Sequence, residues 1–410
     1  MQKYDIIIIG SGLGGLICGA VLSKEGYSVC IVEKNAQTGG CFQSFKRFGR
    51  TLDTGIHYIG SLDEGEILHR TFTYLDIMDK VNLIRMNENN FDQICFPDKS
   101  YSYAMGSERF VTTLAQDFPK EKENIQRYIQ DISSIAHTIS PEVFKKGKIS
   151  TATLDVFSIS AWKKISETTN NEKLRQVLSN PVMLYGGDKN TSTFYIHSMI
   201  VWSYLHGSYR FVGSSIQMTD ALVKKIEENG GTVMTQAEVT KIHCKNDTVS
   251  GVELGNGKLL ETKYVISTLH PLATLQMTEK TISIRKAYLT RLASLTNSYG
   301  FFTAYLIKKK NSTPYLNNNF YLYADGQDAW HKTSFPNNDK EIKSVMISMK
   351  PSTDNPYYTD AIELLTPMFF SEVEQWADTL YERRGDAYRE FKQKKAEEII
   401  LFAKQFFPDI

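Results

Sequence analysis

Glycine residues and one acidic residue near the start of the chain have the types and spacing of a dinucleotide-binding site. The sequence GSGLGG at residues 10–15 has the G-x-G-x-x-G pattern, and Glu33 follows about 20 residues later. In such a site the first glycine permits a tight turn, the second lets the backbone approach a pyrophosphate, and the third allows helix and strand to pack closely. The acid accepts a hydrogen bond from a ribose hydroxyl and disfavours NADP, whose 2′-phosphate it would repel.

The segments on either side of the glycine motif are expected to form the strands and the helix that position it. Residues 4–9 form a β-branched apolar run typical of a buried parallel strand, residues 13–24 favour a helix, and residues 27–32 favour a second strand that ends at Glu33. A pyrophosphate would meet free N–H groups at the positive end of the helix dipole. Strand, loop, helix, strand and acid agree, so the sequence predicts a βαβ site for the ADP half of a dinucleotide.

The residues after Glu33 favour FAD over NAD. Two adjacent glycines, Gly39 and Gly40, are followed by a short basic stretch at residues 46–50 and by the block DTGIHY at residues 53–58. In an NAD-dependent dehydrogenase this stretch should form another crossover helix, and no helical pattern is present.

The block LDTGIHYIG at residues 52–60 resembles the FAD-dependent family of phytoene desaturases, carotenoid isomerases and retinol saturases, and most of all the retinol saturase branch. YGGDKN at residues 185–190, FVGSSIQMTDAL at 211–222 and ENGGTVMTQAEVTKI at 228–242 follow the family order. The resemblance implies an α/β fold: a Rossmann-like FAD-binding domain with a parallel sheet, and a discontinuous α+β substrate domain as in amine oxidases and phytoene desaturases. The implied ranges are 1–105 plus 213–280 for the FAD domain and 106–212 plus 281–410 for the substrate domain.

The motif and the resemblance together give a set of candidate FAD contacts. The backbone of Val239 is expected at the adenine edge, and Ser267 and Thr268 are expected to close a turn near the cofactor. The full set is Gly10, Ser11, Gly12, Leu13, Gly14, Gly15, Glu33, Lys34, Gly39, Gly40, Cys41, Arg47, Asp53, Thr54, Gly55, Ile56, Val239, Ser267 and Thr268.

His57 and Tyr58 are the candidate catalytic residues, because the resemblance places them near the flavin ring. A neutral imidazole or phenol there could move the second proton when a C=C bond is saturated or formed. The alternative is a histidine that only orients a loop. The candidate substrate pocket is aromatic, with Tyr195, Trp202, Tyr204 and Tyr209, and suits a flat apolar molecule; ordinary core packing of a helix is the alternative.

Two features depart from the family pattern. Cys41 stands where many relatives have an arginine that touches the pyrophosphate, so Lys46, Arg47 or Arg50 is expected to supply that charge. The glycine-rich segment that covers the flavin in the family is not visible in residues 363–410. The sequence therefore looks C-terminally truncated and is expected to hold FAD weakly.

Further elements are expected along the rest of the chain. Residues 247–261 favour a hairpin that turns at Gly255-Asn256-Gly257, residues 372–407 favour a helix, and residues 299–308, 320–323 and 343–349 favour strands.

The amino-acid composition limits the classes of molecule that the protein is expected to bind. The net charge of +1 argues against nucleic acid, and no metal-ligand spacing or bilayer-spanning apolar run is found. We expect a cytoplasmic protein with reversible association at membrane surfaces. Because only one dinucleotide fingerprint is present, electrons are expected to pass to or from the lipophilic substrate and a diffusible donor or acceptor.

These features predict an FAD-dependent oxidoreductase that saturates, desaturates or isomerises C=C or C–C bonds of a polyene or isoprenoid, such as a retinoid or carotenoid. One alternative is an amine-oxidase-like flavoenzyme for a small amine or alcohol. Another, of a different class, is a truncated protein that binds FAD poorly and acts as an interaction module.

Overall fold

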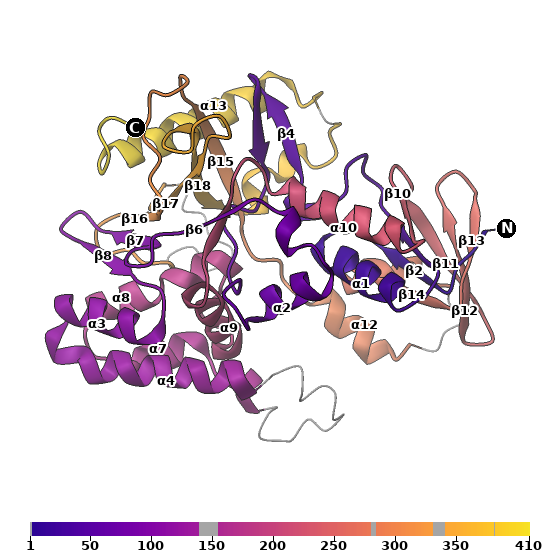
Figure 1. Ribbon diagram of the computed structural model, residues 1–410, viewed down its shortest axis with the longest axis horizontal. Coiled ribbons are helices and arrows are strands. Elements are labelled where there is room, and N and C mark those ends of the chain that lie inside the picture. Colours follow the sequence, from indigo (N-terminus) through magenta and orange to yellow (C-terminus); the bar gives the residue numbers. More distant parts are fainter. Residues whose placement is uncertain (1, 139–154, 280–283, 331–340, 381) are drawn as a thin grey trace. The chain divides into compact units, whose positions relative to one another are not determined.

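The computed structural model describes residues 2–138, 155–279, 284–330, 341–380 and 382–410. It divides into two compact units, each built from several chain segments (Figure 1). Unit 1 comprises Met1–His57, Ile67–Leu83 and Phe211–Thr296, and unit 2 comprises Tyr58–Glu66, Ile84–Arg210 and Asn297–Ile410.

A parallel four-stranded sheet is the centre of unit 1, with the order β10-β3-β2-β14. Its two middle strands, β2 (Ile6–Ile9) and β3 (Val29–Val32), are fully buried, as their unbroken β-branched sequences predict. The predicted helix is observed as α1 (Leu13–Lys24) and packs against α10 (Ile216–Glu228) (Figure 1). The edge strands are β10 (Thr232–Met234) and β14 (Tyr264–Ser267).

A second sheet in unit 1 has the order β1-β13-β12-β11. The expected hairpin is confirmed, since β12 and β13 are antiparallel on either side of residues 255–258. Ile7 and Ile9 of the first sheet share a core with Val252 and Leu254 of the second, so the two sheets form packed layers. The strands are β1 (Gln2–Lys3), β11 (Val239–Lys245), β12 (Thr248–Leu254) and β13 (Leu259–Glu261).

Shorter elements complete unit 1. The hairpin of β4 (Ser44–Arg47) and β5 (Arg50–Asp53) follows the 3-10 turn η1 (Gly40–Phe42). The others are α2 (Ile67–Tyr74), η2 (Met78–Lys80), α11 (Pro271–Met277) and α12 (Lys286–Ala293). A separate two-stranded sheet, formed by β6 (Leu83–Arg85) and β9 (Tyr209–Phe211), consists mostly of unit 2 residues.

A six-stranded mixed sheet forms unit 2, in the order β15-β18-β17-β16-β7-β8. Its two faces bury different clusters: Tyr321 and Tyr323 point to one core, and Phe320 and Leu322 point to the other, as alternation along a strand requires. The strands are β7 (Asp92–Cys95), β8 (Ser100–Tyr103), β15 (Gly300–Ile307), β16 (Asn319–Tyr323), β17 (Ser344–Pro351) and β18 (Thr359–Met368).

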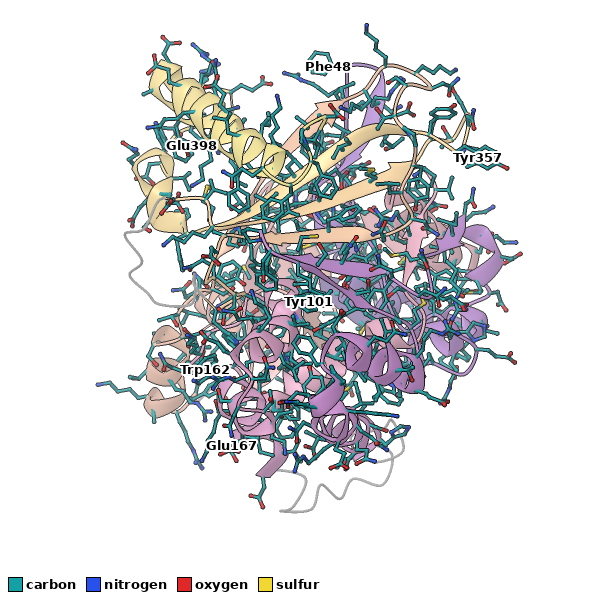
Figure 2. The ribbon with its side chains drawn as sticks, turned by 90° about the vertical axis from the view of Figure 1, so that its left-hand side faces the viewer. Phe48, Tyr101, Trp162, Glu167, Tyr357 and Glu398 are labelled. Carbon is teal, nitrogen blue, oxygen red and sulfur yellow. The ribbon has the colours of Figure 1, made fainter. Side chains whose placement is uncertain are left out.

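Helices cover both faces of this sheet. On the face of β15, β17 and β18 lies α13 (Gly385–Lys404), the yellow helix of Figure 2, on which Glu398 is labelled. The other face packs against α3 (Ser107–Asp117), α4 (Lys122–Thr138), α7 (Ala161–Thr168), α8 (Glu172–Leu178) and α9 (Phe194–Leu205). Short 3-10 turns are η3 (Pro119–Glu121), η4 (Val156–Ser158), η5 (Asn180–Tyr185), η6 (Phe370–Glu372) and η7 (Glu374–Trp376).

The sequence expectations and the structure differ in the domain bounds and in one helix. Residues 58–66 and 84–105, expected in the FAD domain, belong to unit 2, and residues 284–296, expected in the substrate domain, belong to unit 1. Residues 84–105 join unit 2 because β7 pairs in parallel with β16 and antiparallel with β8. The helix expected over residues 372–407 is shorter, and only 385–404 are α-helical. The three expected strands near residues 299–349 are confirmed as β15, β16 and β17.

Candidate functional site

The loop between β2 and α1 contains two kinds of glycine. Gly10 has φ +97°, and a Cβ on Gly15 would lie 2.2 Å from the Gly10 carbonyl oxygen, so both glycines are required by the fold of the loop itself. A Cβ on Gly12 or Gly14 would meet no atom within 4 Å. Gly12 is the N-cap of α1 and provides no side-chain cap, so the N–H groups of the first turn have no intrahelical partner. This arrangement fits a pyrophosphate.

The glycine pair after β3 lies against this loop. The Gly39 N–H donates to the Ser11 carbonyl at 2.9 Å, and a Cβ on Gly40 would lie 3.2 Å from the Gly12 Cα atom. Both glycines have positive φ, +113° and +57°, which side chains rarely adopt. Cys41 follows them with an exposed thiol.

Glu33 lies at the end of β3 and is bound by the same loop. Its Oε2 atom accepts from the Ser11 hydroxyl at 2.6 Å and from the Ser11 N–H at 3.0 Å, while Oε1 accepts from the Asn35 N–H at 2.8 Å. Burial opposes ionisation, but the hydrogen bonds from Ser11 and Asn35 and the charge of Lys34 outweigh it and lower the pKa of Glu33. The carboxylate is therefore ionised and Oε1 retains a free lone pair, as a ribose hydroxyl requires.

Thr268 and the segment before Val239 lie at the same ends of the parallel strands, after β14 and β10. Thr268 follows β14 and donates through both its N–H and its hydroxyl to the Ile9 carbonyl, each at 3.0 Å. The Ala237 N–H donates to the Glu33 carbonyl at 2.9 Å, which places the segment before Val239 beside Glu33. The carboxyl ends of parallel strands are where α/β sheets bind ligands.

The Asp53 carboxylate accepts hydrogen bonds from other residues of the chain. It is fully buried and accepts from the Ser214 hydroxyl at 2.5 Å and from the Ser215 N–H at 3.2 Å, so it ties the β4–β5 hairpin to the start of α10. Thr54 donates through its hydroxyl to the Gln43 carbonyl at 2.9 Å. Arg47 is exposed at the far end of the hairpin.

A buried polar cluster lies in unit 2 around Tyr58. The Tyr58 hydroxyl donates to Asp92 Oδ2 at 3.0 Å and lies 2.8 Å from the Tyr321 hydroxyl. Asn319 donates to Asp92 Oδ1 at 2.8 Å and accepts from Arg210 at 2.7 Å. Arg210 is fully buried and also donates to the Ser348 hydroxyl at 2.9 Å and to the Met349 carbonyl.

Asp92 is the titratable group of this cluster. Burial raises its pKa to about 7, against the hydrogen bonds from Asn319 and Tyr58 and the charge of Arg210. Burial also raises the pKa of Tyr58 well above its ordinary value, so Tyr58 stays a neutral phenol. Sequence reasoning missed Asp92 and Arg210 because no motif surrounds them; the signal available was a charged residue between Tyr209 and Phe211 in an aromatic stretch.

The four aromatic residues of the expected substrate pocket have separate neighbours. The rings of Tyr58 and Tyr204 lie 4.3 Å apart, centre to centre. Tyr195 contacts Phe157, Trp202 stacks on His206, and the Tyr209 hydroxyl donates to Asp63. Tyr204 thus contacts the candidate catalytic residue Tyr58, and the substrate role of the four residues stays a prediction. His57 is buried at the end of the first segment of unit 1, directly before Tyr58.

In the described residues, no group of histidine, cysteine and acidic side chains has the arrangement of a metal site. A search of the same residues for a helix long and apolar enough to cross a membrane also finds none.

Comparisons with known proteins agree with this geometry. A family described as "NAD(P)-binding Rossmann-like domain" matches residues 8–75, which include the glycine loop, Glu33 and the glycine pair. All-trans-retinol 13,14-reductase of Rattus norvegicus is 24% identical over 449 residues, covering 100% of this chain and 73% of the relative. Prolycopene isomerase 2, chloroplastic, of an Oncidium hybrid cultivar is 23% identical and is covered to 71%.

Along its whole length the chain is similar to proteins of the retinol saturase and phytoene desaturase family. It spans about three quarters of the length of the retinol reductases it matches.

Solved structures of other proteins are similar to this chain in fold. An oxidoreductase from Methanosarcina mazei superposes with a TM-score of 0.68 at 19% identity, covering 100% of this chain and 85% of that one. Putrescine oxidase bound to putrescine gives a TM-score of 0.65 at 13% identity, covering 98% and 81%. The expected Rossmann-like and amine-oxidase-like fold is therefore confirmed.

Proposed function

We propose that this protein is an FAD-dependent oxidoreductase that acts on C=C or C–C bonds of a lipophilic polyene or isoprenoid. The observation that carries the proposal is the dinucleotide cradle of unit 1: open space at Gly12 and Gly14, the glycine pair against it, and the ionised Glu33 beside it. Relatives that are named for retinol reduction and carotenoid isomerisation supply the substrate class.

FAD suits the residues after Glu33 better than a nicotinamide dinucleotide. Residues 40–53 form a 3-10 turn and a hairpin rather than a crossover helix that continues the sheet. The negative charge of Glu33 opposes a 2′-phosphate, which disfavours NADP. Gly10–Gly15, Glu33, Gly39–Gly40 and Val239 would hold the ADP half, and Asp53–Ile56 remain proposed contacts.

When bound, the flavin supplies hydride transfer to or from the substrate. The chain must then exclude water and move a proton. We assign the proton to Tyr58 or His57: the Tyr58 hydroxyl is neutral and hydrogen-bonded to Asp92, whose pKa of about 7 lets it return or accept a proton near neutral pH. The electrons are exchanged with a diffusible donor or acceptor.

Anaerobic spectroscopy of the FAD-loaded protein tests the proposal. Chemically reduced protein is mixed with all-trans-retinol, and oxidised protein is mixed with a partly saturated carotenoid precursor and, separately, with putrescine. The proposal expects the flavin absorbance to change with a polyene or isoprenoid and not with putrescine. A response to putrescine alone would favour an amine oxidase, and protein that never binds flavin would favour an interaction module.

The Gly12→Val variant is the matched control for these mixtures. Its side chain would occupy the open space of the cradle, so it should show no absorbance change with any substrate.

A further inference from the structure

The β4–β5 hairpin of unit 1 ends in a two-residue turn with an unusual residue. The register pairs Ser44 with Asp53 at the base and Arg47 with Arg50 at the tip, so Phe48 and Gly49 form the turn. Both have positive φ, 49° and 69°, which is the signature of a type I′ turn. Asn and Gly favour these positions, whereas a bulky aromatic residue with positive φ is a strained outlier.

The side chain at this strained position is also exposed. Phe48 is 78% exposed and Phe45, three residues earlier, is 39% exposed. Figure 2 shows the Phe48 ring beyond the end of the hairpin ribbon. The turn therefore carries two unfavourable features, a strained backbone and an aromatic ring in water, which the fold of unit 1 does not require.

Positive charge surrounds the ring. The strands contribute Lys46, Arg47 and Arg50, and no acidic residue occurs from Gly39 to Leu52. Lys46 and Arg47 are exposed, and the Arg47 guanidinium lies 5.9 Å from the centre of the Phe48 ring. Arg50 is half-buried with an interaction of its own, so Lys46 and Arg47 supply the exposed charge.

Among the described residues of unit 2, the most exposed aromatic side chain has surroundings of mixed charge. Tyr357 is 81% exposed, and its neighbours in sequence include Asp360 and Asp354, of which Asp354 pairs with Lys310 at 2.7 Å. An exposed ring is therefore not specific to the hairpin. The hairpin differs from the Tyr357 site because its exposed ring occurs together with exposed cations and a strained turn.

We infer that the tip of the β4–β5 hairpin docks this protein on a membrane surface that contains anionic lipids. Phe48 enters the boundary between headgroups and acyl chains, and Lys46 and Arg47 bind the lipid phosphates. The surface of an anionic bilayer is negatively charged at the headgroups and apolar beneath them. The cations of the hairpin match the first layer, and the aromatic ring matches the second. A flat acidic protein surface would satisfy the charges but would leave the ring without an apolar partner.

Sedimentation of the full chain with vesicles tests this inference without any need for catalysis. The wild type should bind vesicles of phosphatidylcholine with phosphatidylserine, should bind phosphatidylcholine alone much less, and should be released by high salt. Lys46→Gln with Arg47→Gln should lower the partition coefficient about 25-fold, at roughly five-fold for each cation.

The Phe48→Asn variant shows whether Phe48 contributes to vesicle binding or to the stability of the fold. Because Asn tolerates positive φ, this variant should unfold at a higher denaturant concentration than the wild type, yet its partition coefficient should fall about tenfold. A merely structural role for Phe48 predicts lower stability and unchanged vesicle binding, which would overturn the inference.

Two variants serve as controls. Tyr357→Ser removes a more exposed ring, and Lys309→Gln with Lys310→Gln removes two cations from another exposed site. Both should bind vesicles as the wild type does. Equal binding to neutral and anionic vesicles, or a loss in either control as large as in the hairpin variants, would contradict docking by the hairpin.

Discussion

The Ser11 hydroxyl donates a 2.6 Å hydrogen bond to Glu33, and the Ser11 N–H donates to the same carboxylate oxygen at 3.0 Å. This double contact joins the glycine loop after β2 to the acid at the end of β3. The two sequence features that predict a dinucleotide site are therefore one structural unit. The second carboxylate oxygen accepts from the Asn35 N–H and keeps a further lone pair for a ligand.

Glu33→Gln should weaken binding of FAD and of ADP by about five- to tenfold. The variant replaces a charge-assisted hydrogen bond to a ribose hydroxyl, worth about 1.5–3 kcal/mol, with a neutral one worth about 0.5–1.5 kcal/mol. Isothermal titration measures both ligands, and Glu261→Gln, on β13 of the second sheet, is the control. Equal loss in the control variant would show a general effect of charge.

We expect the reactivity of the Cys41 thiol to report ligand binding. It is the exposed one of the five cysteines, and its backbone follows Gly40, which lies against Gly12. A maleimide should label this thiol first, and ADP or FAD at ten times its Kd should slow the labelling about tenfold. Cys41→Ser should abolish the fast reaction. Saturating FAD that leaves the labelling rate unchanged would place the cofactor elsewhere.

Gly12 and Gly15 should respond differently to alanine. A Cβ at residue 15 would lie 2.2 Å from a backbone oxygen, so Gly15→Ala should lower the free energy of unfolding by about 1–3 kcal/mol or more. Gly12→Ala adds a methyl group to open space and should change it by less than about 1 kcal/mol. Urea denaturation checks this, and equal destabilisation of both variants would contradict the described loop.

The features predicted from sequence are those that local physics determines. Unbroken apolar strands and the glycine spacing identified β2, α1 and β3, and α1 has the predicted bounds. Sequence did not reveal that β7 pairs with β16, because that contact joins residues more than 200 positions apart. The Asp92–Arg210 cluster was missed for the same reason: its members come from separate strands, and no spacing connects them.

The free energy of unfolding of the wild type should fall as pH rises, and Asp92→Asn should abolish this fall. The pKa of Asp92 is raised from about 3.9 in the unfolded chain to about 7 in the folded protein. Between these values the folded state binds more protons, so the free energy of unfolding of the wild type falls as pH rises, by up to about 1.4 kcal/mol per unit, and levels off above the folded pKa. The isosteric amide does not titrate.

Denaturation of both proteins at pH 5 and pH 8 is the measurement. The stability of Asp92→Asn relative to the wild type should rise between the two pH values. A difference that stays constant would show that Asp92 titrates as an ordinary surface acid.

FAD titration of the wild type and of Gly12→Val tests the central claim most directly, because every proposed activity depends on the cradle in unit 1. We expect quenching of flavin fluorescence that saturates at one FAD per wild-type chain and is lost in a folded Gly12→Val variant. Absence of binding to the wild type, or equal binding by a folded Gly12→Val, would contradict the assignment.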